Sequence, residues 1–321
     1  MGLFASLLIG TIFGTIGTHT NIEFFNQMSE YCKAVQGSAM AVSIGCSLGA
    51  NGLVLFSLCV VGHCANGFGG PLGVFVITLL ACEIGKIVSK ETKIDILVTP
   101  IVTILTGVLL SIAIAPAIGA GASAVGGAIM WATEQQPFIM GILVSVIVGV
   151  VLTLPISSAA ICAALGLTGL AGGAAVAGCC AQMVGFAVMS FRENKWGGLV
   201  AQGIGTSMLQ MGNIVKNPKI WIAPTLASAI TGPIATCVFK LQMNGAAVSS
   251  GMGTCGFVGQ IGVYTGWLND IANGAKVAIT AFDWVGLILI SFVLPAILTY
   301  VISVPLRKIG WIGENDLKLD I

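Results

Sequence analysis

Charged side chains are scarce in this 321-residue sequence: Asp, Glu, Lys and Arg make up 8% of it, against about 25% in soluble domains. No charge occurs between Asp95 and Glu134, or between Glu134 and Arg192. The 13 basic residues are balanced by 12 acidic ones, so the excess of positive charge that a nucleic-acid partner would require is missing. Uncharged runs of this length indicate several membrane spans. The fold class we expect is an all-α polytopic membrane protein.

Signatures of metal, cofactor and hydrolase chemistry are missing as well. The ten cysteines form no CxxC pair, and most lie in apolar stretches, where a thiol acts as a small hydrophobic group. No GxSxG, Walker A or HExxH motif occurs, so we expect no catalytic residue, metal or cofactor. GMGTCG at 251–256 is formally GxGxxG, but a dinucleotide site needs that motif after a buried strand, and its surroundings are typical of membrane helices.

Apolar runs are what the chain does contain, and they predict about nine membrane segments. The segments 71–88 and 198–215 are short and polar, which favours broken or re-entrant elements. The segment 158–190 is longer than one span needs, so we expect it to be tilted, broken or partly interfacial. The nine segments cover residues 2–17, 36–61, 71–88, 96–118, 137–156, 158–190, 198–215, 220–241 and 284–304.

The basic residues predict an orientation. Placing loops 86–95 and 216–219, together with the tail from Arg307, in the cytoplasm satisfies the positive-inside rule. The N-terminus then lies outside and the C-terminus inside. Arg192 and Lys195 fall outside in this scheme. If their loop is cytoplasmic instead, the segments around it become re-entrant hairpins.

The chain also resembles itself. Residues 70–88 overlay residues 197–215 with six identities, which indicates two tandem repeats in the same orientation, a transporter architecture with its site at the repeat interface. The expected domains are a leading membrane helix with a polar loop (1–35), a first membrane repeat (36–157), a second membrane repeat (158–304) and a cytoplasmic tail (305–321).

Polar side chains inside the apolar segments are the candidate ligands for a solute. Glu83 is the one acid well inside an apolar run and so indicates function, although an ion pair with Lys86 at helical spacing explains it equally well. Thr206, Gln210 and Asn213 are spaced to form a polar stripe on one helix face. Such groups contact a neutral polar solute or bond between helices. The candidate set is Asn51, Glu83, Gln182, Thr206, Gln210, Asn213, Gly251, Gly253, Thr254 and Gln260.

Two glycine-rich stretches, 119–127 and 251–259, complete the predicted site. They allow close helix packing, or they are loops that enter the bilayer and present backbone groups to a solute. Their matching positions in the two repeats favour loops. We expect a pocket near the bilayer midplane, between 71–88 and 198–215 and closed by these loops, with Glu83 and Gln210 at equivalent positions in the repeats.

Three strings carry a resemblance to a known family: GKIVSKETKIDILVTPIVTI (85–104), GIGTSMLQMGNIVKNPKIWIAPTLASAITGPIATCVFK (203–240) and SSGMGTCGFVGQIG (249–262). They are similar to the EIIC-like membrane family of the phosphoenolpyruvate-dependent sugar phosphotransferase system, in the branch of perfringolysin O regulator-like proteins. The resemblance implies a bacterial plasma-membrane protein for sugar uptake. It also implies EIIA and EIIB phosphotransfer proteins, expected as separate partners because no soluble segment here fits either. The glutamate motif of glucose-type permeases is absent, so no catalytic glutamate is carried over.

We therefore expect an EIIC-like permease that binds and translocates a sugar or similar small polar solute and forms a homodimer in the lipid bilayer. Two alternatives stay open: a membrane regulator that senses a ligand without transport, and a secondary transporter coupled to protons through Glu83. Uptake into vesicles separates the regulator from the other two. Dependence on phosphoenolpyruvate separates the permease from the proton-coupled transporter.

Overall fold

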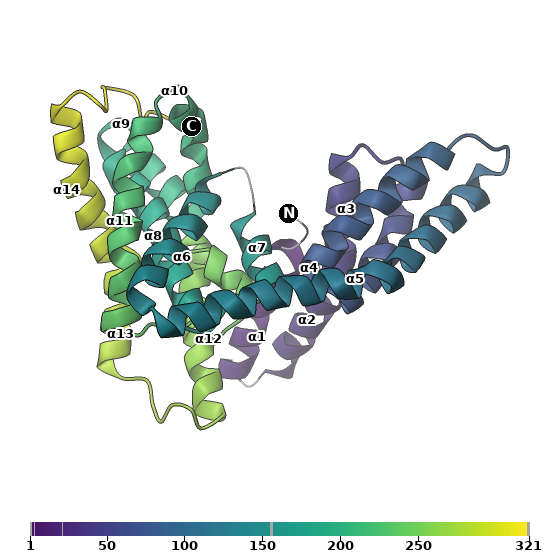
Figure 1. Ribbon diagram of the computed structural model, residues 1–321, viewed down its shortest axis with the longest axis horizontal. Helices are drawn as coiled ribbons and strands as arrows, with labels where there is room; N and C mark the ends of the chain where they lie inside the picture. The colour runs from purple at the N-terminus through teal and green to yellow at the C-terminus, as the bar shows by residue number, and fades with distance from the viewer. Residues whose placement is uncertain (1, 3, 21, 155–156, 320–321) are drawn as a thin grey trace. The chain divides into compact units, whose positions relative to one another are not determined.

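The computed structural model describes residue 2 and residues 4–20, 22–154 and 157–319, which are predominantly helical (Figure 1). Within these residues the one extended pairing is an isolated antiparallel bridge between Gly169 and Met243. The chain divides into two compact units, Met1–Val125 and Gly126–Ile321, which we call unit 1 and unit 2. The expected all-helical class is therefore confirmed, and each unit is described by itself.

Unit 1 is built mainly from long apolar helices. Its α4 is kinked at Gly70, whose φ of 58° and ψ of −160° suit glycine alone, and Pro71 cannot donate the next helical hydrogen bond. Helices α3 and α4 touch backbone to backbone, because a Cβ on Gly62 would lie 2.4 Å from the Gly37 oxygen. The elements are η1 (Phe4–Leu8), α1 (Ile9–Thr20), α2 (Glu23–Ala34), α3 (Gln36–Ser47), α4 (Gly52–Val88) and the first part of α5 (Asp95–Gln135).

Unit 2 is organised around one buried helix, α8, which packs against α6, α11 and α14. Many α8 residues are Gly, Ala or Cys, and a Cβ on Gly178 would lie 1.8 Å from the Ser145 oxygen of α6. The elements after α5 are α6 (Pro137–Thr153), α7 (Ser158–Leu165), α8 (Gly169–Met189), α9 (Phe191–Val200), η2 (Ala201–Gly205), η3 (Ser207–Gln210), α10 (Met211–Lys216), η4 (Pro218–Trp221), α11 (Ile222–Pro233), η5 (Ile234–Val238), η6 (Ala247–Gly251), η7 (Cys255–Phe257), α12 (Val258–Ala272), α13 (Ala281–Ile288), η8 (Leu289–Val293) and α14 (Leu294–Lys308).

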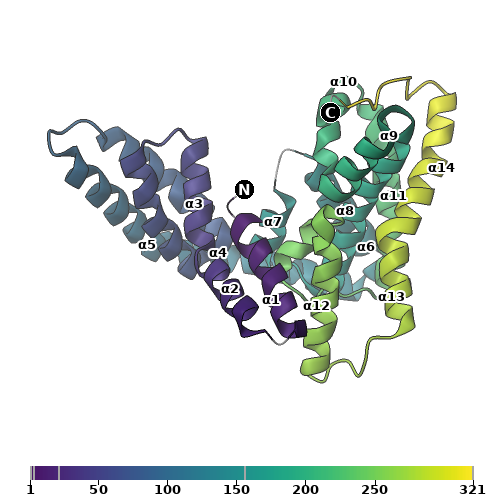
Figure 2. The same ribbon diagram turned by 180° about the vertical axis from the view of Figure 1, so that it is seen from behind.

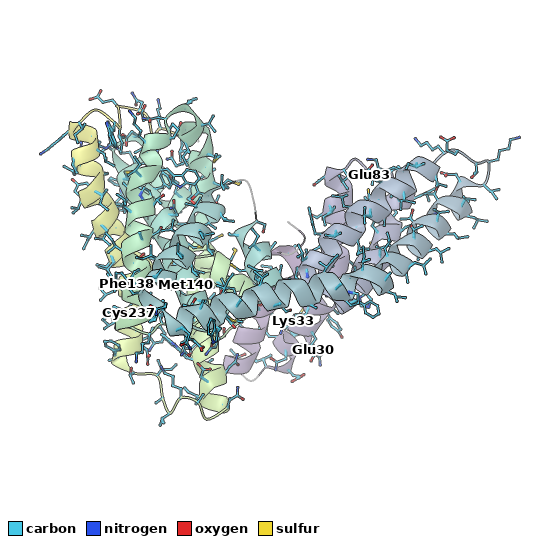
Figure 3. The ribbon with its side chains drawn as sticks, viewed as in Figure 1. Glu30, Lys33, Glu83, Phe138, Met140 and Cys237 are labelled. Atoms are coloured by element: carbon cyan, nitrogen blue, oxygen red, sulfur yellow. The ribbon has the colours of Figure 1, made fainter. Side chains whose placement is uncertain are left out.

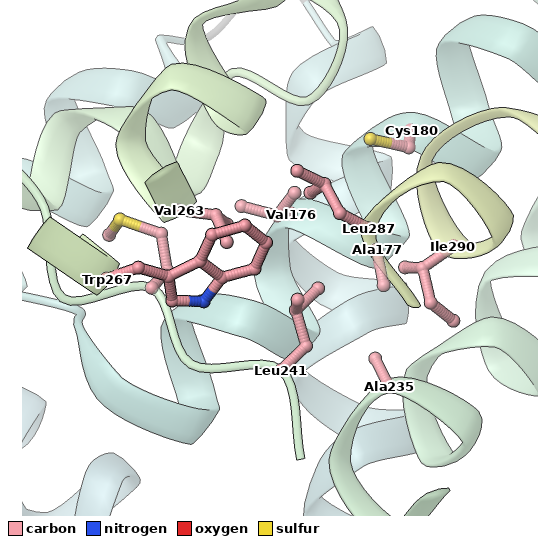
Figure 4. Packing of buried hydrophobic residues seen from close by; sticks show 10 residues of the cluster. Val176, Ala177, Cys180, Ala235, Leu241, Val263, Trp267, Leu287 and Ile290 are labelled. Carbon is pink, nitrogen blue, oxygen red and sulfur yellow. The ribbon is translucent and has the colours of Figure 1, made fainter. Parts of the chain in front are cut away.

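The core of unit 2 joins α8 to the last third of the chain (Figure 4). Val176 and Ala177 of α8 pack with Trp267 of α12 and Leu287 of α13. Leu241, from the irregular segment after η5, completes this contact. Small side chains on the central helix thus leave room for one large aromatic ring, which fixes where α12 meets α8.

Five helical stretches in the described residues are long and apolar enough to cross a membrane, so the predicted count of nine spans is not confirmed. The predicted segment 36–61 is interrupted between α3 and α4, and 198–215 consists of short helical pieces. The predicted segment 158–190 is indeed broken, at Gly166, which has a left-handed φ of 61°. The five stretches are Gly52–Val88, Asp95–Gln135, Gly169–Met189, Pro218–Val238 and Ala281–Lys308.

The first glycine-rich stretch, 119–127, is not a loop. It lies inside the continuous helix α5, so its predicted loop structure is wrong. A backbone group without a partner in hydrocarbon costs several kcal/mol, whereas glycine in a helix costs only about 1 kcal/mol. The glycines instead allow close approach: a Cβ on Gly126 would lie 1.7 Å from the Leu165 oxygen.

The aligned stretches 70–88 and 197–215 differ in local structure. The first is the second half of α4, and the second runs through the end of α9, η2, η3 and α10. The two-repeat organisation and its boundaries at 36–157 and 158–304 stay a prediction.

One relative assignment in the predicted topology is wrong. It placed Arg192 and Lys195 on the side opposite Arg307, but Arg307 Nη1 lies 2.9 Å from Glu193 Oε1. Figure 2 shows α9, α10 and the end of α14 together at one end of unit 2. Arg192 and Lys195 lie on the same side as Arg307 because α9 to α10 is a set of short pieces and not a full crossing. This is the alternative arrangement that the sequence left open. We call this the basic end of unit 2; it carries Arg192, Lys195, Lys216, Lys219, Arg307, Lys308 and Lys318.

Candidate functional site

Two helix interruptions in unit 2 lie side by side and satisfy each other's backbone groups. Gly169, which begins α8, and Met243 exchange two backbone hydrogen bonds of 3.0 and 2.9 Å. Ser158 Oγ of α7 donates to the Gly251 oxygen at 2.6 Å. Ser250 Oγ donates to the Leu167 oxygen, also at 2.6 Å. Irregular backbone at membrane depth is tolerated when protein supplies such partners, so these interruptions form one junction.

The second glycine-rich stretch belongs to this junction, and its predicted irregular structure agrees with the fold. Residues 247–257 form two 3-10 turns with a turn between them, and helix α12 begins at Val258. Gly253 has a φ of 53°, and its Cβ position is only 2.7 Å from Cys179 Cβ of α8. At Gly251 an added Cβ would lie 2.5 Å from the Ser158 oxygen. Glycine here serves both backbone conformation and close packing.

Thr254 and Gln260 of the candidate set also face α8. Thr254 Oγ1 donates to the Gly203 oxygen at 2.5 Å and lies 3.6 Å from Met183 Sδ. Gln260 Nε2 lies 3.3 Å from Cys180 Sγ. Gln260 Oε1 is buried and accepts no hydrogen bond from the described residues. A buried acceptor without a donor is unusual in a native fold, so among the candidate residues Gln260 stands out by a buried acceptor that no described residue pairs.

Gln182 is the centre of a saturated network. Its Oε1 accepts from Trp221 Nε1 at 2.9 Å and from Thr153 Oγ1 at 3.3 Å. Its Nε2 lies 3.4 Å from Thr225 Oγ1 and 3.5 Å from Ser228 Oγ. This fully buried amide therefore links α8 to α6, η4 and α11, which matches the interhelical interpretation.

Gln210 and Asn213 bind the tail of the chain. Gln210 Nε2 donates to Gln202 Oε1 at 2.9 Å and to the Leu317 oxygen at 3.0 Å. Asn213 Nδ2 donates to Gln210 Oε1 at 2.9 Å and to the Lys318 oxygen at 2.8 Å. Of the predicted cytoplasmic tail, 305–321, the first residues still belong to α14, which continues to Lys308, and Leu317 and Lys318 fold back onto unit 2. Its cytoplasmic location stays a prediction.

Asn194 holds the same tail segment from α9. Its amide donates to the Leu317 oxygen at 2.7 Å and accepts from the Leu319 N–H at 2.8 Å. Asn217 Nδ2 donates to the Trp311 oxygen at 2.9 Å. Leu317 itself is fully buried, in a cluster that includes Phe186 of α8. Side-chain amides thus form hydrogen bonds with backbone groups of the tail, as a neighbouring strand would in a sheet.

Thr206, Gln210 and Asn213 do not form the predicted stripe on one helix face, so this prediction is wrong. Thr206 has extended backbone (φ −161°, ψ 142°), and residues 207–210 form a 3-10 turn. Thr206 Oγ1 accepts from the Met208 N–H at 3.1 Å. A threonine at a helix start satisfies a free backbone donor in this way, so Thr206 starts a new element where the pattern predicted a continuous helix.

Asn51 and Glu83 belong to unit 1. Glu83, labelled in Figure 3, lies on α4. Its Oε1 lies 2.9 Å from Lys86 Nζ, and its side chain is 48% exposed. This is the ion pair that the sequence offered as the alternative to a functional carboxylate. Asn51 caps α4 by accepting from the Val54 N–H at 3.1 Å, and its amide donates to Ser89 Oγ. The predicted pocket between 71–88 and 198–215 stays a prediction.

A pocket that the sequence did not predict opens beside the junction. It has a volume of about 330 Å³, within the range of small-molecule sites, about 300–1,000 Å³. Its wall is formed by the extended segment that bridges to α8, by the end of α12 and by the start of α13. The lining residues are Phe239, Lys240, Leu241, Gln242, Asn244, Trp267, Asp270, Ala275, Lys276 and Asp283.

The charged groups of this pocket are balanced, and side-chain contacts hold Asp270, Lys276 and Asp283 in place. Asn244 Nδ2 donates to both carboxylate oxygens of Asp270, at 3.0 and 2.9 Å. Lys276 Nζ lies 2.7 Å from Asp283 Oδ1 and 5.5 Å from the centre of the Trp267 ring. Lys240 and Lys276 offset the two aspartates, so the pocket has no net charge. In the described part of the chain no three His, Cys, Asp or Glu side chains converge to hold a metal ion.

Local sequence did contain one signal for this pocket. Asp270, Lys276 and Asp283 lie close together in a chain that is otherwise poor in charge. Such a cluster between apolar segments marks a polar surface, and Trp267 one turn before it supplies an aromatic ring. Asn244 gives no such signal, because it lies 26 residues from Asp270 and meets it only in the fold.

Comparison with known families gives one result. The family model for the EIIC component of the phosphotransferase system matches residues 1–319. No curated protein and no solved structure matches the chain.

Proposed function

The chain belongs to the EIIC family of the phosphotransferase system, and from this membership we propose a membrane permease that binds a sugar in the 330 Å³ pocket of unit 2 and passes it along the junction. Separate EIIA and EIIB proteins are the proposed phosphate donors, and a homodimer is the proposed assembly. Family membership supports sugar as the class of solute. The choice of pocket is supported by the chemistry and position of its lining.

The pocket chemistry suits a neutral polyhydroxylated molecule. Asn244 holds the Asp270 carboxylate from one side, and a carboxylate has about four acceptor positions, so sugar hydroxyls can donate to those that remain. Lys240 is an exposed donor on the same wall. Two positive and two negative side chains leave no net charge, which favours a sugar over an ionic solute.

One observation carries the proposal: the pocket wall and the junction are the same segment. Leu241 and Asn244 line the pocket, and Met243 between them pairs with Gly169 at the start of α8. Interrupted helices form the substrate sites of many transporters. A sugar leaving the pocket along this segment meets Gly251, Gly253, Thr254 and Gln260, which we retain as transport residues. Contacts of a solute with the other predicted residues stay a prediction.

Charge distribution supports an orientation for the pocket. The helical stretch Ala281–Lys308 runs from Asp283 in the pocket to Lys308 at the basic end, and its 28 residues span about 40 Å. The basic end carries seven Lys and Arg residues, and the pocket carries two. The positive-inside rule then puts the basic end in the cytoplasm, with the C-terminus inside as expected. The pocket accordingly faces outside, where sugar arrives.

The test is uptake of labelled sugars by the full chain in proteoliposomes, with and without phosphoenolpyruvate and the phosphotransfer proteins. A thermal-shift screen across sugars first selects the solute. Asp270→Asn should weaken binding by one to two orders of magnitude, because a hydrogen bond to a charged group contributes about 1.5–3 kcal/mol. Glu314→Gln, an exposed acid at the basic end, is the matched control and should leave binding unchanged.

A second variant tests the route. Gln260→Met keeps the length of the side chain and removes the unused acceptor, so sugar binding in the pocket should persist while uptake falls. Equal binding by the parent chain and Asp270→Asn would exclude this pocket. Binding without any uptake would favour the membrane regulator. Uptake that needs no phosphoenolpyruvate and is lost in Glu83→Gln would favour the proton-coupled transporter.

A further inference from the structure

A lateral groove at the basic end of unit 2 has apolar walls and a basic rim. It has a volume of about 450 Å³ and lies between the end of α8, helix α9 and the last turns of α14. Val188, Leu199 and Val304 supply apolar walls, one from each of these helices. Arg192, Arg307 and Lys308 are among the residues that line it.

The positive charge of the groove is only partly neutralised. Arg307 is fixed, with Nη1 2.9 Å from Glu193 Oε1 and Nη2 3.0 Å from the Met189 oxygen. Arg192 and Lys308 are exposed and form no ion pair with the described residues. One acid against three cations leaves an excess of two positive charges beside apolar surface. The sugar pocket at the other end of the same spanning helix has no such excess.

Aromatic residues mark the level of the groove in the bilayer. Trp196 is 71% exposed, and Tyr300 is 47% exposed on the wall of the groove. Trp and Tyr gather where the membrane meets water. Lys308 ends the membrane-spanning stretch Ala281–Lys308. The basic rim therefore lies at headgroup depth, and the apolar walls lie at the depth of the acyl chains.

We propose that this groove binds an anionic phospholipid, whose headgroup phosphate contacts Arg192 and Lys308 while its acyl chains lie along Val188, Leu199 and Val304. The charge excess selects an anionic headgroup, because basic pockets beside membrane helices attract lipid phosphates. The apolar walls select a lipid over a free phosphate, which would leave them uncovered. The bound lipid stabilises α14 against α9. This inference concerns a surface remote from the sugar pocket and does not depend on the proposed function.

The test is native mass spectrometry of the full chain released from nanodiscs of defined composition. We expect the parent chain to retain phosphatidylglycerol in preference to phosphatidylcholine of the same acyl chains. Arg192→Ala and Lys308→Ala should each weaken retention about fivefold, the effect of roughly 1 kcal/mol per basic residue near an anionic lipid surface. Lys216→Ala, an exposed lysine of the basic end outside the groove, should change retention less than twofold.

Competition distinguishes the lipid from a soluble anion. Glycerol phosphate carries the same phosphate without acyl chains and should displace no phosphatidylglycerol at equal concentration. Effective displacement by glycerol phosphate would overturn the lipid assignment in favour of a free phosphate site. Equal retention of both lipids by the parent chain would overturn it without any variant. An equal loss in Lys216→Ala would do the same, because it would reduce the effect to surface charge.

Discussion

The glycine-rich stretches 119–127 and 251–259 each contain four glycines, yet one is a regular helix and the other is irregular over most of its length. In the irregular stretch Gly253 and Gly256 have φ values of 53° and 52°. Neighbouring segments also satisfy its free groups, as Ser158 does for the Gly251 oxygen. Glycine therefore permits a break in a membrane helix, whereas nearby hydrogen-bond partners decide whether one forms.

The largest loss of stability is expected from Gly253→Ala. The new Cβ would lie 2.7 Å from Cys179 Cβ, at a backbone conformation that alanine resists. Backbone strain of about 1–2 kcal/mol and overpacking of about 1–3 kcal/mol should together lower the free energy of unfolding by roughly 2–5 kcal/mol. The measurement is unfolding in detergent by heat or denaturant. Gly256→Ala has the same kind of φ and its nearest neighbour at 3.7 Å, so it should show the strain alone; equal losses in both would refute the packing part.

A smaller loss is expected from Ser250→Ala. This change removes the donor to the Leu167 oxygen and leaves a buried carbonyl unsatisfied, which costs about 1–3 kcal/mol. Unfolding curves measured beside Ser47→Ala provide the reference, because exposed Ser47 bonds only within its own helix and should lie within about 0.5 kcal/mol of the parent. If the two variants were equally stable, the serine would not hold the junction together.

The smallest effect, and of opposite sign, is expected from Gly121→Ala in α5. Its added Cβ would meet nothing within 4 Å, and alanine is favoured over glycine in a helix by up to about 1 kcal/mol. The variant should therefore unfold at a slightly higher temperature. Gly126→Ala, in the same helix but 1.7 Å from the Leu165 oxygen, should be destabilised. Destabilisation by Gly121→Ala would indicate that this stretch is not a regular α-helix.

The sequence predicted best the features that depend on residues close together along the chain. The uncharged runs predicted membrane helices. The excess length of 158–190 predicted a tilted, broken or partly interfacial segment, and the segment is broken at Gly166. The spacing of Glu83 and Lys86 offered an ion pair as an equal alternative to a functional carboxylate, and the ion pair is present. The family was also identified correctly from three strings. The break at Gly166 and the ion pair of Glu83 each depend on residues a few positions away along the chain.

The contacts that the sequence did not predict join residues far apart along the chain. Gln210 was predicted to contact a solute, which stays a prediction, and the structure adds a hydrogen bond from its amide to the Leu317 oxygen, 107 residues on. Asn244 and Asp270 form the pocket only because α12 returns to the irregular segment before it. An amide donates and accepts equally well toward protein, lipid headgroup or sugar, so its type alone does not identify its partner.

Folding order follows from the way the tail is held. Asn194 bonds Leu319 across 125 residues, and contacts of such separation form late, because the intervening chain must first be closed into a loop. Until then the cluster that receives Leu317, including Phe186 and Ile214, lacks its last side chain. A nascent or interrupted molecule therefore displays an incomplete apolar surface at the basic end. This exposed apolar surface distinguishes unfinished chains from finished ones for chaperones and proteases at the membrane surface.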